Sequence, residues 1–137
     1  MAVKVHVVTP EREVWTGETQ LLVARGVDGE VGVMGGHAPL LVQLAVGPLK
    51  AQTEQGEVVA VVDGGFLHVS THDGVTRADV LASHAELAED IDVEAARRRA
   101  TELRERLDRR DDDLVDSELA RVRRELRKAL VRVDLAG

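Results

Sequence analysis

The first half of the chain repeats one pattern, a short run rich in valine and leucine that is closed by glycine, proline or aspartate. In KVHVVT (4–9), apolar and polar positions alternate, which is typical of a strand with one buried face. Eighteen of the 23 valines lie within the first 80 residues, and valine favours strands. The same pattern predicts further strands at 19–26, 30–34, 39–47, 48–53, 57–65, 66–70 and 74–81.

Turn-forming segments separate several of these runs. QGE (55–57), DGG (63–65) and HDG (72–74) contain residues that tolerate positive φ, so each predicts a hairpin turn. Many short strands joined by such turns are typical of a sandwich or small barrel. We therefore expect an antiparallel β-sandwich or flattened barrel over residues 1–85.

The last third of the chain follows a helical period instead. No glycine occurs between residues 75 and 136, and apolar residues recur every three or four positions. This predicts two amphipathic helices, at about 92–109 and 113–133, with Asp92 and Asp113 as N-caps. The apolar positions are Ala96, Ala100, Leu103 and Leu107 in the first helix and Leu119, Val122, Leu126, Ala129 and Val133 in the second.

The short link DRRDDD (108–113) predicts that the two helices pack antiparallel. The expected fold is therefore mainly β plus α, with a sandwich at 1–85 and a two-helix hairpin at 86–137. The apolar seam of the hairpin is narrow and rich in alanine, so it buries little area. We expect the hairpin to be marginally stable and able to open.

Charge divides the chain at the same place. Residues 1–91 carry five Lys/Arg against thirteen Asp/Glu, whereas residues 92–137 carry thirteen against twelve. The acidic first part argues against binding to nucleic acid, which needs a basic surface. There are no cysteines, which excludes disulfides and thiolate metal sites and fits a reducing compartment. Neither a signal peptide nor a membrane-spanning run is present, so we expect a cytoplasmic protein without membrane insertion.

The stretch GEVGVMGGHAPLL (29–41) is unusually rich in glycine. Its four glycines predict positive φ angles or close approach of another backbone. Apolar side chains follow them in the same loop, and an exposed apolar patch is rare on a lone monomer. The simplest use of such a loop is a protein interface. The glycines are Gly29, Gly32, Gly35 and Gly36, and the apolar residues are Met34, Ala38, Pro39, Leu40 and Leu41.

At these residues the chain resembles a known family. GEVGVMGGHAPLL, VDGGFLHVSTHDGVTRADVLA (62–82) and IDVEAARRRA (91–100) are similar to shared segments of the epsilon subunit of bacterial F-type ATP synthases, called delta in mitochondria. The resemblance implies a non-catalytic rotor subunit of a proton-translocating ATP synthase. Such a subunit lies in the central stalk, between the gamma subunit and the c-ring, and is peripheral at the cytoplasmic face of the plasma membrane.

The resemblance also assigns roles to single residues. Glu30 matches the acidic residue that faces the polar loops of the c-ring, and His37 matches the histidine placed near gamma. Relatives often carry an aromatic residue and a proline where this chain has Met34 and Gly35, so the detailed shape of the contact differs. The expected partner interface comprises Glu30, Val31, Gly32, Met34, His37, Ala38, Pro39 and Leu40.

For the hairpin, the resemblance implies a regulatory role. In an extended state the helices reach the alpha and beta subunits of the catalytic head, where basic side chains meet acidic segments of beta and inhibit ATP hydrolysis. A helical tail of about 45 residues, with a rise of about 1.5 Å per residue, is long enough to reach the catalytic head. The expected inhibitory contacts are Arg121, Arg123, Arg124, Arg127 and Lys128.

Some members of the family bind ATP through a motif of Ile or Leu, Asp, two variable residues, Arg and Ala. Ile91, Asp92 and Ala96 match it, but Ala95 stands in the place of the arginine. A cation that would pair with phosphate is therefore missing there. We expect no cofactor, and ATP only as a weak regulatory ligand or not at all. The residues that could still contact it are Asp92, Arg97, Arg123 and Arg127.

Two other classes of function remain open from the sequence. A stand-alone ligand-binding sandwich with a helical dimerisation tail would need a concave apolar pocket. A hydrolase would need converging histidine and carboxylate groups, and the spacing supplies none. His68 and His72 are four apart on a strand but have no further ligand beside them, so we expect surface histidines. No catalytic or metal-binding residues are predicted.

Overall fold

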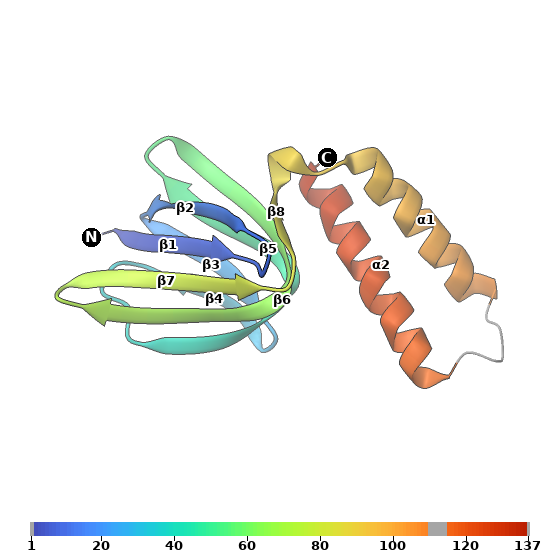
Figure 1. Ribbon diagram of the computed structural model, residues 1–137, viewed down its shortest axis with the longest axis horizontal. Helices are drawn as coiled ribbons and strands as arrows, with labels where there is room; N and C mark the ends of the chain where they lie inside the picture. The colour runs from blue at the N-terminus through green and yellow to red at the C-terminus, as the bar shows by residue number, and fades with distance from the viewer. Residues whose placement is uncertain (1, 110–114, 137) are drawn as a thin grey trace. The chain divides into compact units, whose positions relative to one another are not determined.

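The computed structural model describes residues 2–109 and 115–136. The chain divides into two compact units, Met1–Ala88 and Glu89–Gly137, whereas the sequence places the boundary after residue 85. Figure 1 shows the first unit as a sandwich of strands and the second as a pair of helices. The strands are β1 (Val3–Val8), β2 (Glu13–Thr19), β3 (Leu21–Gly26), β4 (Gly29–Val33), β5 (Leu40–Thr53), β6 (Gly56–His72), β7 (Val75–Ala82) and β8 (Ala85–Leu87).

One continuous sheet builds the sandwich. Its strands follow the order β2-β1-β7-β6-β5-β3-β4, and β8 pairs with β6. Neighbouring strands are antiparallel except β1 and β7, which run parallel. The expected β-sandwich is confirmed, with one parallel pair in an otherwise antiparallel sheet.

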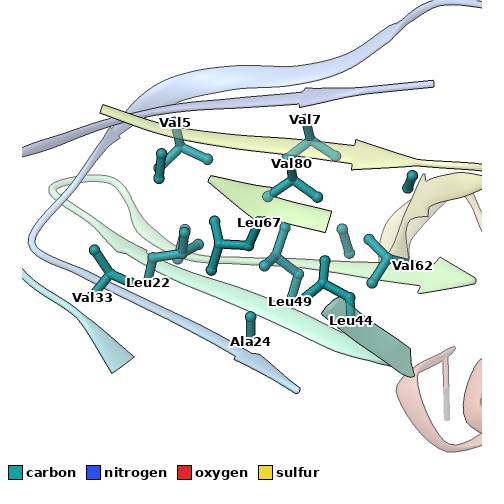
Figure 2. Packing of buried hydrophobic residues seen from close by; sticks show 14 of the residues in the cluster. Val5, Val7, Leu22, Ala24, Val33, Leu44, Leu49, Val62, Leu67 and Val80 are labelled. Atoms are coloured by element: carbon teal, nitrogen blue, oxygen red, sulfur yellow. The ribbon is translucent and has the colours of Figure 1, made fainter. Parts of the chain in front are cut away.

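The core lies between the two layers of the folded sheet. In Figure 2, Val5, Val7 and Val80 face Leu22, Leu44 and Leu49 across it. Valine and alanine fill most of the remaining space, and the partly buried Trp15 packs against the edge of the cluster. The buried members are Val3, Val5, Val7, Leu22, Ala24, Val33, Leu44, Leu49, Ala51, Ala60, Val62, Leu67, Val69, Ala78, Val80 and Ala82.

Two of the predicted strand breaks are wrong. The runs 39–47 and 48–53 form the single strand β5, and 57–65 and 66–70 form the single strand β6. The DGG segment is therefore not a hairpin turn. Gly64 and Gly65 have φ of +97° and +126°, and the β5–β6 ladder skips one rung beside them, between Leu44↔Gly65 and Val46↔Asp63, while its register stays the same on both sides. This glycine pair interrupts the regular ladder while the strand continues past it.

The other predicted hairpin turns are confirmed. β6 and β7 are joined by Asp73 and Gly74, with φ of +52° and +77°, and positive φ at both central residues is what a type I′ hairpin requires. β5 and β6 pair up to Thr53↔Gly56, with Gly56 at φ +118°. Strands β2 and β8 were not predicted. β2 has only two large apolar residues, so its apolar alternation is weak.

A short 3₁₀ turn, η1 (Ala88–Asp90), spans the boundary between the units, and the second unit contains the helices α1 (Val93–Arg109) and α2 (Asp116–Ala136). The Asp92 cap is confirmed, because its Oδ1 accepts a hydrogen bond of 3.0 Å from the Ala95 backbone N. The predicted cap Asp113 lies outside the described residues. The predicted seam is also confirmed: Ala96, Ala100, Leu103, Val122 and Ala129 are buried, and Leu107, Leu119, Leu126 and Val133 are half-buried.

Candidate functional site

A tight turn at residues 34–37 joins β4 to the loop before β5. The His37 backbone N donates to the Met34 carbonyl oxygen at 3.1 Å, and Gly36, the third residue, has φ +84°. Positive φ at the third position, with none at the second, identifies a type II turn. Of the four glycines predicted to have special geometry, Gly29 and Gly36 have positive φ. Gly32 instead lies in β4, where an added Cβ would meet only Leu21 at 3.6 Å.

The turn is bound to the β6–β7 hairpin. The Gly36 backbone N donates to Thr76 Oγ1 at 2.7 Å, and Thr71 Oγ1 donates to the His37 carbonyl oxygen at 3.4 Å. His37 Nδ1 lies 2.7 Å from the Ala38 carbonyl oxygen. Hydrogen bonds to other strands therefore hold the loop in one conformation.

Most of the predicted interface faces outward. Met34 is 62% exposed, and Glu30, Gly32, Ala38 and Pro39 are exposed as well. Three residues lie deeper: His37 is half-buried, and the half-buried side chains of Val31 and Leu40 pack against the core. The last two therefore also hold the loop to the sandwich.

The structure adds outward-facing apolar residues on the sheet beside the loop. Leu41, Phe66 and Leu81 are 67%, 49% and 57% exposed. Phe66 lies directly opposite Leu81 on β7, and Val8 of β1 opposite Leu81 on its other side. Leu41 is a diagonal neighbour of Phe66, because Leu41 pairs with His68. We call Val8, Leu41, Phe66 and Leu81 the apolar row.

Sequence reasoning identified only one member of the apolar row, Leu41, because alternation shows that a strand has two faces but not which one is buried. Phe66 carries the one signal that was available. It is the single phenylalanine of the chain, and it lies within a segment that resembles the family. A large aromatic residue that is half exposed is typical of interfaces.

A ligand-binding sandwich would need an apolar cavity, and two hollows of the sandwich do not fit that description. A groove of about 280 Å³ is lined by residues of β3, β4, β5 and β6, mainly with charged and polar side chains. An apolar hollow beside Trp15 holds only about 10 Å³, far below the volume of a ligand pocket. The groove is lined by Val23, Ala24, Arg25, Glu30, Pro48, Lys50, Gln52 and Glu57.

Within residues 2–109 and 115–136, no group of three or more His, Cys, Asp or Glu could hold a metal ion. His68 and His72 are both exposed, as expected of surface histidines. Among the same residues, no helix is both long and apolar enough to cross a membrane. The outward-facing apolar side chains of the sandwich include those of the loop and of the apolar row.

Residues 2–88 match the family model for the β-sandwich domain of the ATP synthase delta/epsilon chain. The chain belongs to this family. It is 49% identical over 96 residues to the ATP synthase epsilon chain of Thermobifida fusca, covering 68% of each chain. The epsilon chain of Streptomyces avermitilis is 46% identical over 101 residues, which is 72% of this chain and 78% of that one.

One relative extends the similarity through both helices. The sodium ion specific ATP synthase epsilon chain of Propionigenium modestum is 35% identical over 133 residues, which is 97% of this chain and 92% of that one. Among solved structures, a chain of the Euglena gracilis mitochondrial ATP synthase has a TM-score of 0.77 at 22% identity, covering 95% of this chain and 78% of that chain. The resemblance to epsilon subunits inferred from three sequence segments is confirmed.

In the helical unit, the predicted inhibitory residues fall into two groups. Arg121, Arg123, Arg124 and Arg127 are exposed on α2, and none of them forms an ion pair within the part of the chain that the structure describes. Lys128 differs, since its side chain is only 18% exposed and its Nζ lies 3.2 Å from Glu125 Oε1. The four arginines therefore present free cationic groups, and Lys128 is engaged within its own helix.

The predicted ATP contacts are not all free. Asp92 caps α1, and Arg97 Nη1 donates to Glu94 Oε1 at 2.9 Å. Ala95, at the position of the motif arginine, provides a backbone N–H that Asp92 already accepts. Both predicted contacts on α1 are therefore already engaged by groups of the same helix.

Proposed function

We propose that the chain is the epsilon subunit of the central stalk of a proton-translocating F-type ATP synthase. In this role it binds the gamma subunit and the c-ring, as a non-catalytic, peripheral subunit at the cytoplasmic face of the plasma membrane. One observation carries the proposal: a chain of the delta/epsilon family displays an apolar loop and an apolar row on the outside of a well-packed sandwich.

The solved structures with the same fold support these partners. The Euglena gracilis chain comes from an assembly of OSCP, F1 and the c-ring. A Tetrahymena thermophila chain, with a TM-score of 0.58 at 12% identity over 100% of this chain and 98% of that one, comes from a central stalk and c-ring assembly. We propose that gamma binds the apolar row together with Met34 and His37, because a subunit that rotates with gamma needs a stable interface with a large buried apolar area. We assign the c-ring to the exposed carboxylate of Glu30, which suits a polar loop.

The assignment to gamma can be tested with a charge placed in the apolar row. We expect Phe66→Glu to weaken binding of the full chain to an ATP synthase complex depleted of this subunit by at least about tenfold, as for a central apolar contact. Gln55→Glu adds the same charge at the exposed β5–β6 turn and serves as the control. Equal affinity of the two variants would exclude the apolar row from the interface.

We further propose that the helical hairpin regulates the complex by inhibiting ATP hydrolysis through Arg121, Arg123, Arg124 and Arg127. The four arginines are exposed, and none of them forms an ion pair with another described residue. The seam between the two helices is rich in alanine, so burial of its side chains stabilises the closed hairpin only weakly. In an extended state these cations would meet acidic segments of the beta subunits in the catalytic head.

Charge reversal at these four arginines should raise ATP hydrolysis by the reconstituted complex while leaving assembly intact. Reversal of Arg104 and Arg106, which are exposed on α1, provides a control with basic residues outside the proposed contact. Hydrolysis that stays unchanged in the α2 variant would refute the inhibitory role. For ATP itself we propose weak binding or none, since Ala95 replaces the motif arginine and Asp92 and Arg97 are already engaged.

A further inference from the structure

Thr76 is an unusual member of the sandwich interior. It is fully buried near the start of β7, with Val3 of β1 as its register partner. A buried hydroxyl is unfavourable unless it is hydrogen-bonded. Its Oγ1 accepts the Gly36 backbone N–H at 2.7 Å, so the partner of this buried group is a loop forty positions earlier in the chain.

The N–H that Thr76 accepts is the one that distinguishes two kinds of turn. Types I and II differ mainly in the orientation of the central peptide, here the Gly35–Gly36 peptide, which is flipped between them. Gly36 N–H belongs to that peptide, so a flip to type I would turn it away from Thr76. The hydroxyl therefore stabilises the type II turn that is observed, in which Gly36 has φ +84°.

A second threonine supports the other side of the turn. Thr71 lies directly opposite Thr76 in the β6–β7 ladder, and their Oγ1 atoms are 3.5 Å apart. Thr71 Oγ1 also lies 3.4 Å from the carbonyl oxygen of His37. These two contacts are longer than the one to Gly36, so Thr76 makes the main attachment and Thr71 a weaker one.

We propose that Thr76 is a positioning residue: its buried hydroxyl fixes the type II turn and so sets how Met34 and His37 are presented to the partner. The second half of this statement rests on the proposed function, whereas the first half concerns the chain alone. The interface would then depend on a residue that never touches the partner.

The test compares Thr76→Val, which has a similar shape but no hydroxyl, with Thr76→Ser, which keeps the hydroxyl. The first readout is amide hydrogen exchange of Gly36 in the full chain by NMR. Loss of one hydrogen bond of ordinary strength should speed this exchange by roughly threefold to tenfold in the valine variant. The serine variant should restore slow exchange, and unchanged exchange in the valine variant would overturn the inference.

The second readout is affinity for the ATP synthase complex depleted of this subunit. We expect the valine variant to bind roughly threefold to tenfold more weakly, and the serine variant to bind like the wild type. Faster exchange without weaker binding would refute the positioning role. If the wild type itself does not bind, the proposed function fails, while the exchange data still decide whether Thr76 holds the turn.

One measurement needs no variant and covers the case in which Thr76→Val does not fold. In the wild type, a type II turn places the Gly35 Hα close to the Gly36 amide proton, and a type I turn places the two amide protons close together. A strong Hα–amide nuclear Overhauser effect between these residues supports the inference. A dominant amide–amide effect would overturn it.

Discussion

Replacing Gly65 with alanine should destabilise the sandwich more than any other glycine substitution within β6. An added Cβ would lie 2.0 Å from the Leu81 carbonyl oxygen and 2.8 Å from the Ala82 Cα, both of which are backbone atoms of β7. Gly65 also has φ +126°, a region that L-residues rarely adopt. Because the obstacle is backbone, no side-chain rotation relieves it, and β6 or β7 must move.

The expected cost has two parts. Backbone strain at such a φ costs about 1–3 kcal/mol. Forcing extra volume into a tightly packed site adds about 1–3 kcal/mol, for a total of about 4 kcal/mol. This is a large fraction of the 5–15 kcal/mol by which domains are ordinarily stable.

Gly74→Ala is the matched control. Gly74 also has positive φ, at +77°, but an added Cβ there would meet nothing within 4 Å. Only the strain remains, so we expect a loss of about 1–2 kcal/mol. The difference between the two variants contains the collision with β7 and the greater backbone strain at φ +126° than at +77°.

Urea unfolding followed by tryptophan fluorescence is a suitable assay. Trp15, the single tryptophan, packs against the sandwich core and therefore reports on this unit rather than on the helices. The free energy of unfolding is extrapolated to water for each variant. A Gly65→Ala loss within about 1 kcal/mol of the Gly74→Ala loss would refute the reasoning from the β7 backbone.

Three smaller predictions concern other parts of the chain. Asp92→Ala should cost the helical unit about 1 kcal/mol, measured as loss of helical circular dichroism on heating, because the Ala95 N–H loses its cap. Leu103→Ala should cost about 2–5 kcal/mol in the same assay, since Leu103 is 1% exposed. A hydrogen bond from Thr16 is the main cause that lowers the pKa of Glu13, so Thr16→Val should raise that pKa in an NMR titration. With the folded pKa depressed, the contribution of Glu13 to stability is present above the ordinary carboxyl pKa and is lost as pH falls through the folded value.

Periodicity predicted the elements well where one face of an element is buried by its neighbours in the chain. The helical seam and the alternation in β1 and β7 are of this kind. The glycine pair at 64–65 was misassigned because glycine indicates only that the backbone adopts positive φ. Whether the chain then reverses or continues depends on pairing with β5, which keeps Leu44 opposite Gly65 and Asp63 opposite Val46 on either side of the irregularity.

The candidate site was predictable in one part and not in another. The loop was identified because its glycines and apolar residues are contiguous in sequence. The apolar row was not, because Val8, Phe66 and Leu81 come from three strands whose adjacency is a property of the sheet order. The attachment of Gly36 to Thr76 was equally inaccessible, since nothing local marks a threonine as the acceptor for a distant turn.

The two units differ in how much buried apolar surface is exposed when the helices separate or when the sandwich unfolds. The helical seam has five buried side chains, three of which are alanines, whereas the core of the sandwich is built mainly from valine and leucine. Alanine contributes roughly one buried methyl group, about 0.8 kcal/mol, against about 1.5–3 kcal/mol for valine or leucine. A partner opens the seam if it prefers the separated helices by more than the several kcal/mol that these five side chains contribute. The same preference would leave the sandwich folded, so its loop and apolar row could stay attached to the rotor while the helices change state.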